Sequence, residues 1–226
     1  MNVNADFSQR AVVHADRLDW VQSPMAGVER RMLDRIGDEV ARATTIVRYA
    51  PGSAFSPHVH TGGEEYLVLE GVFQDEYGDF PAGSYVRNPP QSSHTPRSDE
   101  GATILVKLWQ FDPQDRTQVH VDTLRETPLA DPRRPGVSVI PLFKDSREEV
   151  RIEVWAPDAD VSIADHDGLE VFVLEGGFDE AGDHFVRNSW LRLPKGRRFE
   201  ARAGTEGARV WLKRDHLGTD QVAPGT

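Results

Sequence analysis

Short stretches of alternating apolar and polar residues, separated by Gly- and Pro-containing turns, recur along most of the chain. Residues 42–49 alternate around Ile46, and further strand-like stretches cover residues 65–69, 83–87 and 103–111. A period of two places every second side chain on the same face, which is typical of a half-buried β-strand. The pattern therefore predicts an all-β fold built from many short strands.

Two regions near the N-terminus are harder to assign. Residues 20–28 look like a strand or a docking segment, and residues 1–18 look like an arm with little fixed structure. In residues 27–40, acidic residues and arginines surround Met32 and Ile36, so that a helix and a strand fit equally well. We leave that choice open.

The second half of the chain repeats the first at an offset of 105 residues. Residues 168–176 (Gly-Leu-Glu-Val-Phe-Val-Leu-Glu-Gly) align with residues 63–71 (Gly-Glu-Glu-Tyr-Leu-Val-Leu-Glu-Gly), and Pro194 aligns with Pro89. In loops the alignment slips by one residue. The repeat predicts two similar domains in tandem. We expect an N-terminal arm (1–18), a first domain (19–118), a linker (119–136), a second domain (137–218) and a C-terminal tail (219–226).

Composition excludes several classes of protein. The net charge of −11 argues against a nucleic-acid partner that is held through its phosphates. The chain has no cysteine, which excludes disulfides and thiolate ligands. We expect no membrane partner, because no apolar run reaches membrane-spanning length and the polar N-terminus lacks a signal-peptide core. A cytoplasmic location is the simplest interpretation.

The strongest chemical signal is a histidine-rich segment. Residues 58–64 read His-Val-His-Thr-Gly-Gly-Glu, and His94 follows after an intervening turn. On a strand His58 and His60 point the same way, and Glu64 has the same parity. Three imidazole nitrogens and one carboxylate oxygen suit one divalent transition metal, such as Zn, Fe(II), Mn, Ni or Cu. Zn and Fe(II) lead these candidates.

This spacing resembles the first motif of the cupin superfamily, which carries His-x-His, a Glu four residues on, and a glycine, here Gly71. Gly83, Pro89 and His94 fall on the second cupin motif, with Gln91 where that motif usually has glycine. Cupins are small jelly-roll (double-stranded β-helix) barrels. The resemblance implies a tandem pair of cupin barrels, a bicupin. It also implies that His58, His60, Glu64 and His94 are metal ligands.

Residues 62–71 and the segments that follow are most similar to the cupin domain of ChrR-type anti-sigma factors. In that family the cupin domain follows a helical zinc-binding domain that grips the sigma factor. The N-terminal arm here is too short for such a domain and has no cysteine. We therefore do not expect sigma-factor binding in the manner of that family.

The ligand positions do not repeat in the second half. An offset of 105 residues leads from the four candidate ligands to Ile163, Asp165, Leu169 and Phe199. Three of these are apolar, so we expect a packed core there and one metal per chain. The remaining histidines lack a comparable context and are expected to be ordinary surface residues: His14, His120, His166, His184 and His216.

Two functions of different classes fit these features. One is a metal-dependent module that binds a small molecule, in a sensing or regulatory role, as the resemblance to ChrR implies. The other is an Fe(II)-dependent dioxygenase acting on a small diketone or aromatic compound. Neither assignment identifies catalytic residues. The sequence fits either a homodimer or a monomer. Candidate residues for the pocket walls are Tyr66, Val68, Tyr85, Arg87, Arg48 and Trp109.

Overall fold

The computed structural model describes residues 1–38 and 40–218. Within these residues the chain consists of β-strands and one 3-10 turn, η1 (Ala15–Arg17), and has no α-helix. The prediction of an all-β fold is confirmed. The described residues form two compact units, one from Met1–Ala5 and Leu18–Leu124, the other from Asp6–Arg17 and 125–218. The expected C-terminal tail, residues 219–226, lies outside the described residues.

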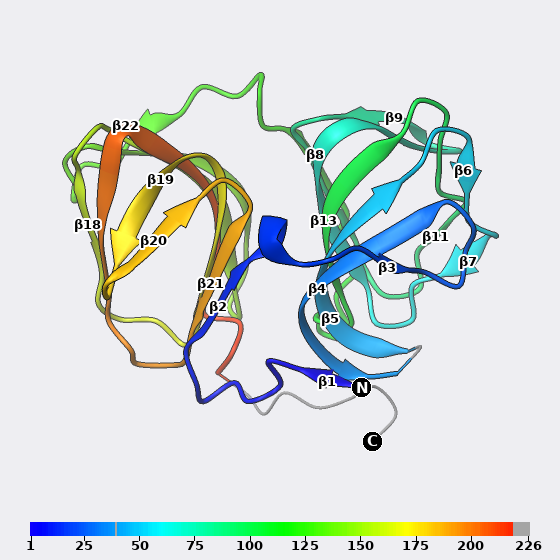
Figure 1. Ribbon diagram of the computed structural model, residues 1–226, viewed down its shortest axis with the longest axis horizontal. Coiled ribbons are helices and arrows are strands. Elements are labelled where there is room, and N and C mark those ends of the chain that lie inside the picture. Colours follow the sequence, from blue (N-terminus) through cyan, green and yellow to red (C-terminus); the bar gives the residue numbers. More distant parts are fainter. Residues whose placement is uncertain (39, 219–226) are drawn as a thin grey trace. The chain divides into compact units, whose positions relative to one another are not determined.

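The first unit is an antiparallel sheet in the order β1-β4-β5-β13-β8-β10-β14, with a separate two-stranded sheet, β11-β7. Strands β3, β6, β9 and β12 pair off this main path (Figure 1). The strands are β1 (Asn2–Val3), β3 (Val21–Gln22), β4 (Val28–Gly37), β5 (Ala41–Tyr49), β6 (Ser53–Ala54), β7 (His58–Val59), β8 (Glu64–Asp75), β9 (Gly78–Pro81), β10 (Ser84–Asn88), β11 (Ser93–His94), β12 (Arg97–Ser98), β13 (Ala102–Leu108) and β14 (Val119–Asp122).

The second unit follows the same plan, in the order β15-β16-β17-β22-β19-β21-β2, with β18 paired to β22 and β20 paired to β19. Its strands are β2 (Ala11–His14), β15 (Leu129–Ala130), β16 (Val137–Lys144), β17 (Glu149–Trp155), β18 (Asp160–Ile163), β19 (Leu169–Glu180), β20 (Asp183–Val186), β21 (Ser189–Leu193) and β22 (Phe199–Arg214). Both units thus have the antiparallel jelly-roll architecture that the repeat predicted.

Strand pairing reproduces the sequence repeat. In the first unit His58 pairs with His94, and in the second unit Ile163 pairs with Phe199, each at an offset of 105 residues. The same residues of the repeat therefore lie opposite one another in both units. Directly opposed side chains on one face of an antiparallel pair are close neighbours. Sequence positions that align in the repeat are thus structural equivalents.

The hairpins after β8 and β19 correct one detail of the sequence alignment. Asp75 pairs with Gly78 in the first unit, and Glu180 pairs with Asp183 in the second. Both hairpins have a two-residue loop, so the offset of 105 residues continues through the turn. The one-residue slip that matching letters suggest at this turn does not occur.

Paired glycines let neighbouring strands approach closely in each unit. Gly71 has a φ of +72°, and a Cβ atom there would lie 2.0 Å from the carbonyl oxygen of Gly101. Gly176 has a φ of +65°, and a Cβ atom there would lie 2.1 Å from the oxygen of Gly207. The positive φ angle and the close approach of a carbonyl oxygen each require glycine at these two positions. The glycine in the first cupin-like motif is therefore a structural requirement.

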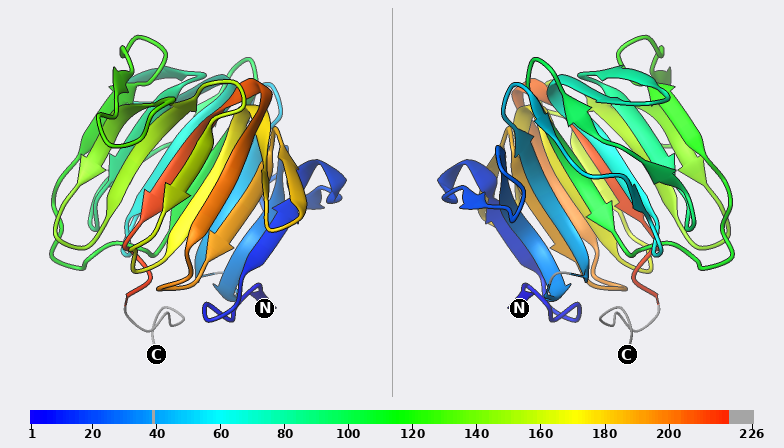
Figure 2. Two further views of the ribbon diagram at one scale, coloured as in Figure 1. Left: turned by 90° about the vertical axis from the view of Figure 1, so that its left-hand side faces the viewer. Right: turned by 90° about the vertical axis from the view of Figure 1, so that its right-hand side faces the viewer.

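The N-terminal segment differs from the expected loose arm. Strand β2 pairs with β21 in register from Ala11 opposite Arg192 to His14 opposite Ser189. Figures 1 and 2 show β2 beside β21 at the end of the sheet of the second unit. Arg10 extends this attachment through an ion pair of 2.5 Å with Glu180. The sequence did not predict this strand, because β2 has only four residues and its pairing partner is remote in sequence.

Two further segments also differ from the sequence-based map. Residues 28–37 form a strand, β4, with a register shift between Met32 and Asp34. A bulge adds a residue to one strand and so breaks the alternation of faces, which made this segment resemble a helix. The expected linker also contains strands, because β14 pairs with β10 and β15 pairs with β16.

Each unit has a core of its own. In the second unit the buried cluster includes Trp155, Phe178 and Phe199, and the rings of Phe178 and Phe185 stack at 4.6 Å. In the first unit the cluster is centred on strands β8 and β13 and includes Tyr66 and Phe73. No described helix is both long enough and apolar enough to cross a membrane.

Candidate metal centre

Four side chains of the first unit converge from two short strands and the start of a long one. His58 lies on β7, His60 follows directly, Glu64 begins β8, and His94 ends β11. The pairing of His58 with His94 brings two of the imidazoles together across the small sheet. His60 is held by backbone hydrogen bonds to the turn before β11, from its own N to the Ser92 oxygen and to its oxygen from the N of Gln91, each 2.9 Å. The fold therefore assembles the residues that the motif grouped in sequence.

The three imidazoles have the geometry of a chelating group. Each of His58, His60 and His94 offers one nitrogen, and these three atoms lie within 4.8 Å of one another. The ring centroids are 4.7–5.1 Å apart. Glu64 completes the cluster, with its Oε2 atom 3.4 Å from Nε2 of His60 and 3.5 Å from Nε2 of His94.

Two of these nitrogens are buried and lack a hydrogen-bond partner. Within the described part of the chain, nothing bonds to Nε2 of His60 or Nε2 of His94, although both residues are less than a tenth exposed. A buried polar atom without a partner is costly unless another group satisfies it. A metal ion bound to both nitrogens would satisfy them, so the residues fit the metal that the motif implies.

Neighbouring groups fix the orientation of the rings. Nδ1 of His94 donates to Oδ2 of Asp75 at 3.0 Å, and Nδ1 of His58 donates to the carbonyl oxygen of Ser56 at 3.0 Å. With Nδ1 protonated, Nε2 keeps its lone pair and turns toward the cluster. Nδ2 of Asn88 donates to Oε2 of Glu64 at 3.3 Å, which holds the carboxylate in place.

Burial and charge act in opposite directions on the two buried histidines. Burial lowers the pKa of His60, although the Glu64 carboxylate favours the charged form. Burial also opposes the charged form of His94, but the hydrogen bond to Asp75 and the charge of Glu64 outweigh it and raise its pKa. The pKa of Tyr66 is raised well above its ordinary value by burial and then by Glu64, so its hydroxyl stays neutral.

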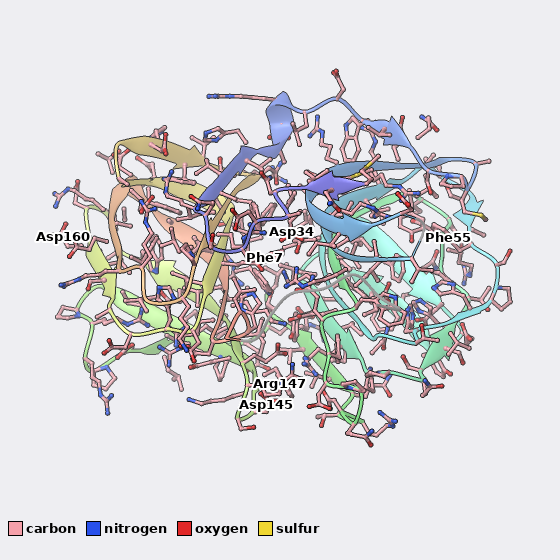
Figure 3. All side chains as sticks on the ribbon, turned by 90° about the horizontal axis from the view of Figure 1, so that it is seen from below. Phe7, Asp34, Phe55, Asp145, Arg147 and Asp160 are labelled. Carbon is pink, nitrogen blue, oxygen red and sulfur yellow. The ribbon has the colours of Figure 1, made fainter. Side chains whose placement is uncertain are left out.

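A cavity of about 590 Å³ adjoins the cluster. His58, His60 and Glu64 all form part of its wall. Most of the remaining wall is apolar and comes from strands β4, β5 and β13 and from Phe55, which is labelled in Figure 3. Cavities of this size and character hold small molecules. The polar cluster therefore lies at the wall of a space that a small ligand can fill.

Trp109 is the only one of the expected pocket residues that lines this cavity. It has a φ of +59°, and its ring lies against Gly62, where a Cβ atom would be 2.2 Å from the indole. Gly63, with a φ of +77°, receives the ring of Phe111 in the same way. Gly62 and Gly63 thus form a turn, and their lack of side chains lets two aromatic rings pack against the backbone.

The other expected pocket residues lie elsewhere. Tyr66 and Val68 face the interior of the unit, but they are packed in the core beside the cavity. Arg48 is exposed and pairs with Glu29 on the outer face. Its neighbours Val47 and Tyr49 line the cavity, so Arg48 is one step out of phase.

Tyr85 and Arg87 also occupy the opposite face of their sheet. Tyr85 donates a hydrogen bond of 2.7 Å to Oε1 of Glu65, and Arg87 pairs with Asp115 at 2.8 Å. The register explains this placement, because Arg87 is the partner of Glu65, whereas Asn88 is the partner of Glu64. Their parity on β10 cannot be assigned from sequence without that register.

Three of the four equivalent positions of the second unit are apolar and buried, as the alignment predicted. Ile163, Leu169 and Phe199 are buried in the core cluster. Asp165 is exposed. Phe199 occupies the position equivalent to His94, and its ring contacts Phe178 at 6.0 Å between centroids.

One of the remaining histidines, His166, is buried, and the side chain of His216 is largely covered, contrary to the expectation of surface residues. Nε2 of His166 donates to the carbonyl oxygen of Arg197 at 2.7 Å, and its Nδ1 accepts from the backbone N of Gly168 at 3.2 Å. His216 contacts Oε1 of Glu170 at 2.7 Å. His14 is half-buried against Ser189. Of the five, His120 and His184 are exposed.

Sequence reasoning missed Asp75 and Asn88. Each contacts a member of the cluster: Asp75 is the last residue of β8, and Asn88 lies on β10, which pairs with β8. Their residue types are common in turns, so nothing in their local sequence separates them from ordinary surface residues. The register of β10 on β8 is the information that would have identified Asn88.

The sequence of residues 8–112, just under half of the chain, matches the family model of the ChrR cupin-like domain. Among curated proteins, none matches significantly. Together with the fold, the family match supports membership of the cupin superfamily.

Several solved structures share the fold. One, from Nostoc punctiforme, is a protein provisionally described as a dioxygenase, with a TM-score of 0.77 and 16% identity over 96% of this chain and 86% of that one. A cupin 2 conserved barrel domain protein from Leptotrichia buccalis has a TM-score of 0.61 and 11% identity over 90% and 95% of the two chains. The Escherichia coli pirin YhhW, in complex with nickel(II), has a TM-score of 0.65 and 14% identity over 91% and 98%. At these identities the similarity concerns the fold.

Proposed function

We propose that His58, His60, Glu64 and His94 bind one divalent transition metal and that the protein binds a small molecule beside it, as a metal-dependent binding or sensing module. The observation that carries this proposal is the pair of buried, unpartnered Nε2 atoms of His60 and His94, which face Glu64 at the wall of a cavity. Mixed nitrogen and oxygen ligands suit Zn, Fe(II), Mn or Ni.

The hydrogen bonds around the cluster support this proposal. Asp75 and the Ser56 carbonyl each hold an imidazole with its Nε2 lone pair available, and Asn88 orients Glu64. Such partners of metal ligands fix the ring orientation and raise the basicity of the ligand. The nickel complex of a structural relative supports metal binding by this fold, and the match to the ChrR cupin-like domain supports a binding role.

Elemental analysis tests the metal. Protein purified without added metal should contain one transition-metal ion, and His58→Ala and His94→Ala should each lose most of it. The matched control is His184→Ala, which removes an exposed histidine of the second unit. Full occupancy in both cluster variants would show that these histidines are not ligands.

An Fe(II)-dependent dioxygenase is the second candidate. The cavity favours it, because a catalytic metal needs open positions and a space for substrate beside it. Bound Fe(II) would supply O₂-dependent oxidation, while Glu64 and the histidines would hold it and the apolar wall would exclude water. Steady O₂ uptake by the Fe(II)-loaded protein with a β-diketone or a hydroxylated aryl ketone, lost in Glu64→Ala, would replace the binding role with catalysis.

A further inference from the structure

The wall of the cavity carries a guanidinium group that the proposed metal centre does not use. Arg30 lies on β4 opposite Val47 of β5, and both residues line the cavity. Its Nη2 atom donates a hydrogen bond of 2.9 Å to Oγ of Ser23. Among residues 1–38 and 40–218, no carboxylate pairs with this guanidinium.

Arg30 differs in this respect from Arg48 and Arg87 of the first unit. Arg48 pairs with Glu29 and Arg87 pairs with Asp115. In a chain with a net charge of −11, a half-buried arginine without a carboxylate partner is conspicuous. The planar guanidinium is the side chain best suited to bind a carboxylate, because it offers two parallel N–H donors.

The charges of the cavity wall also favour an anionic ligand. Glu64 is the one carboxylate among the described lining residues, whereas Arg30 and Arg35 both contribute to the wall. With a divalent ion at the cluster, Glu64 would be neutralised and the cavity would carry a positive charge. An anionic ligand complements such a cavity, whereas a cationic ligand does not.

The strand register separates Arg30 from the cluster. Glu64 lies opposite Leu108 of β13, whereas the row of Arg30 runs through Val47 to Ile104 of the same strand. Four residues along β13 correspond to roughly 13 Å. The wall between these rows includes Val106 and its strand partner Thr45, and no charged residue of the described chain lines it. A ligand that contacts both ends therefore needs a polar group at each end and a hydrocarbon body between them.

We infer that the cavity recognises an apolar carboxylic acid, whose carboxylate binds Arg30 and whose hydrocarbon body packs on the walls of β4, β5 and β13. The opposite end of the ligand faces the His58–His60–Glu64–His94 cluster. That end of the inference rests on the proposed function, whereas the carboxylate end rests on Arg30 and the cavity walls alone.

Calorimetric titration with octanoate and with octanamide tests this inference. The two probes share one hydrocarbon chain and differ in charge. The wild-type protein should bind octanoate at least about tenfold more tightly than octanamide, as expected for a charge-assisted hydrogen bond. Arg30→Met should abolish the difference and leave octanamide binding unchanged, and Arg30→Lys should retain part of it. The matched control is Arg48→Met, which removes an exposed arginine of the outer face.

A second variant protects the test against a failure of Arg30→Met to fold. Ser23→Asp keeps Arg30 and places a carboxylate beside it, which should reduce octanoate binding to the level of octanamide. Equal binding of the two probes to the wild-type protein, binding of neither, or an octanoate preference that survives Arg30→Met would overturn the inference.

Metal analysis of the protein as purified, combined with the same titrations, separates the two proposals. If the purified protein holds no metal but keeps an Arg30-dependent preference for octanoate, the metal centre fails and carboxylate recognition stands. If the metal is present and the preference is absent, the reverse holds.

Discussion

The carboxylate of Asp75 determines how the ring of His94 is presented to the cluster. It accepts the Nδ1 proton at 3.0 Å and is itself buried. The hydrogen bond fixes the tautomer in which Nε2 has a free lone pair. The proposed metal centre therefore depends on a residue outside its ligand set.

Asp75→Asn should weaken metal binding while the ligands stay in place. We expect the metal affinity to fall roughly 10- to 100-fold, the range seen when such a partner of a ligand is replaced. Competition with a chromophoric chelator measures the change. Asp79→Asn, on the neighbouring exposed strand β9, is the control. An unchanged affinity in Asp75→Asn would show that the His94 ring is oriented by its other contacts.

Gln91 has a left-handed backbone conformation that residues other than glycine rarely adopt. Its φ is +76°, whereas its equivalent in the second unit, Gly196, has a φ of +74°. The backbone turn is therefore the same in both units. Gln91 replaces the glycine of the cupin motif without changing the path of the backbone. A non-glycine residue in this region is strained.

Gln91→Gly should stabilise the protein. Relief of the left-handed strain exceeds the extra chain entropy of glycine by roughly 1 kcal/mol. The Gln91 side chain is exposed, so its removal leaves no cavity. Chemical denaturation of the variant and of Ser93→Gly, which replaces a neighbouring exposed residue on β11, measures the effect. A lower free energy of unfolding in Gln91→Gly would mean that the side chain makes a favourable contact.

At the scale of elements, the pair formed by β18 and β22 shows how one framework serves two purposes. Ile163 and Phe199 occupy the places that His58 and His94 occupy on β7 and β11. In the second unit the facing residues complete a buried aromatic cluster with Trp155 and Phe178. Apolar packing therefore stabilises the second unit at the positions where the first unit has its polar cluster.

Phe199→Ala should destabilise the second unit strongly. Phe199 is fully buried, and truncation of such a ring costs about 3–5 kcal/mol because it leaves a cavity. The change appears in denaturant unfolding monitored by circular dichroism. Glu200→Ala, the next residue and an exposed one, should have little effect. A negligible loss of stability in Phe199→Ala would contradict its place in the core.

The sequence predicted some elements and missed others for identifiable reasons. Residues 42–49 alternate without interruption, so the strand β5 was predicted, whereas the bulge in β4 disguised that strand. The convergence of His58, His60 and His94 was also predictable, because a recognisable spacing encodes it. Asp75 and Arg30 were not, since their roles depend on strand pairing and on a cavity that no local pattern describes.

At the scale of the whole molecule, the ends of the two main sheets bear on self-association. The first sheet ends in β1 and β14 and the second in β15 and β2, and these strands have only two to four residues. Very short edge strands are one way in which proteins protect sheet edges from pairing with other chains. Light scattering at micromolar concentration distinguishes the homodimer and the monomer, both of which the sequence allows.

The chain should bind one transition-metal ion and not two. The four candidate ligands all lie in the first unit, and three of the equivalent positions of the second unit are filled by buried apolar side chains. Metal analysis after dialysis should give a ratio near one ion per chain. Asp165→Ala should leave this ratio unchanged. Two tightly held ions would reveal a site outside the repeat.

The attachment of β2 to β21 has a consequence for synthesis on the ribosome. Ala11 pairs with Arg192, so all the residues between them must be translated before this strand meets its partner. The first unit can close its sheet while β2 is still waiting, but the second unit cannot. Closing so long a loop carries a high entropic cost, and folds rich in such remote pairings form slowly. Strand β2 therefore leaves the ribosome long before the strand with which it pairs.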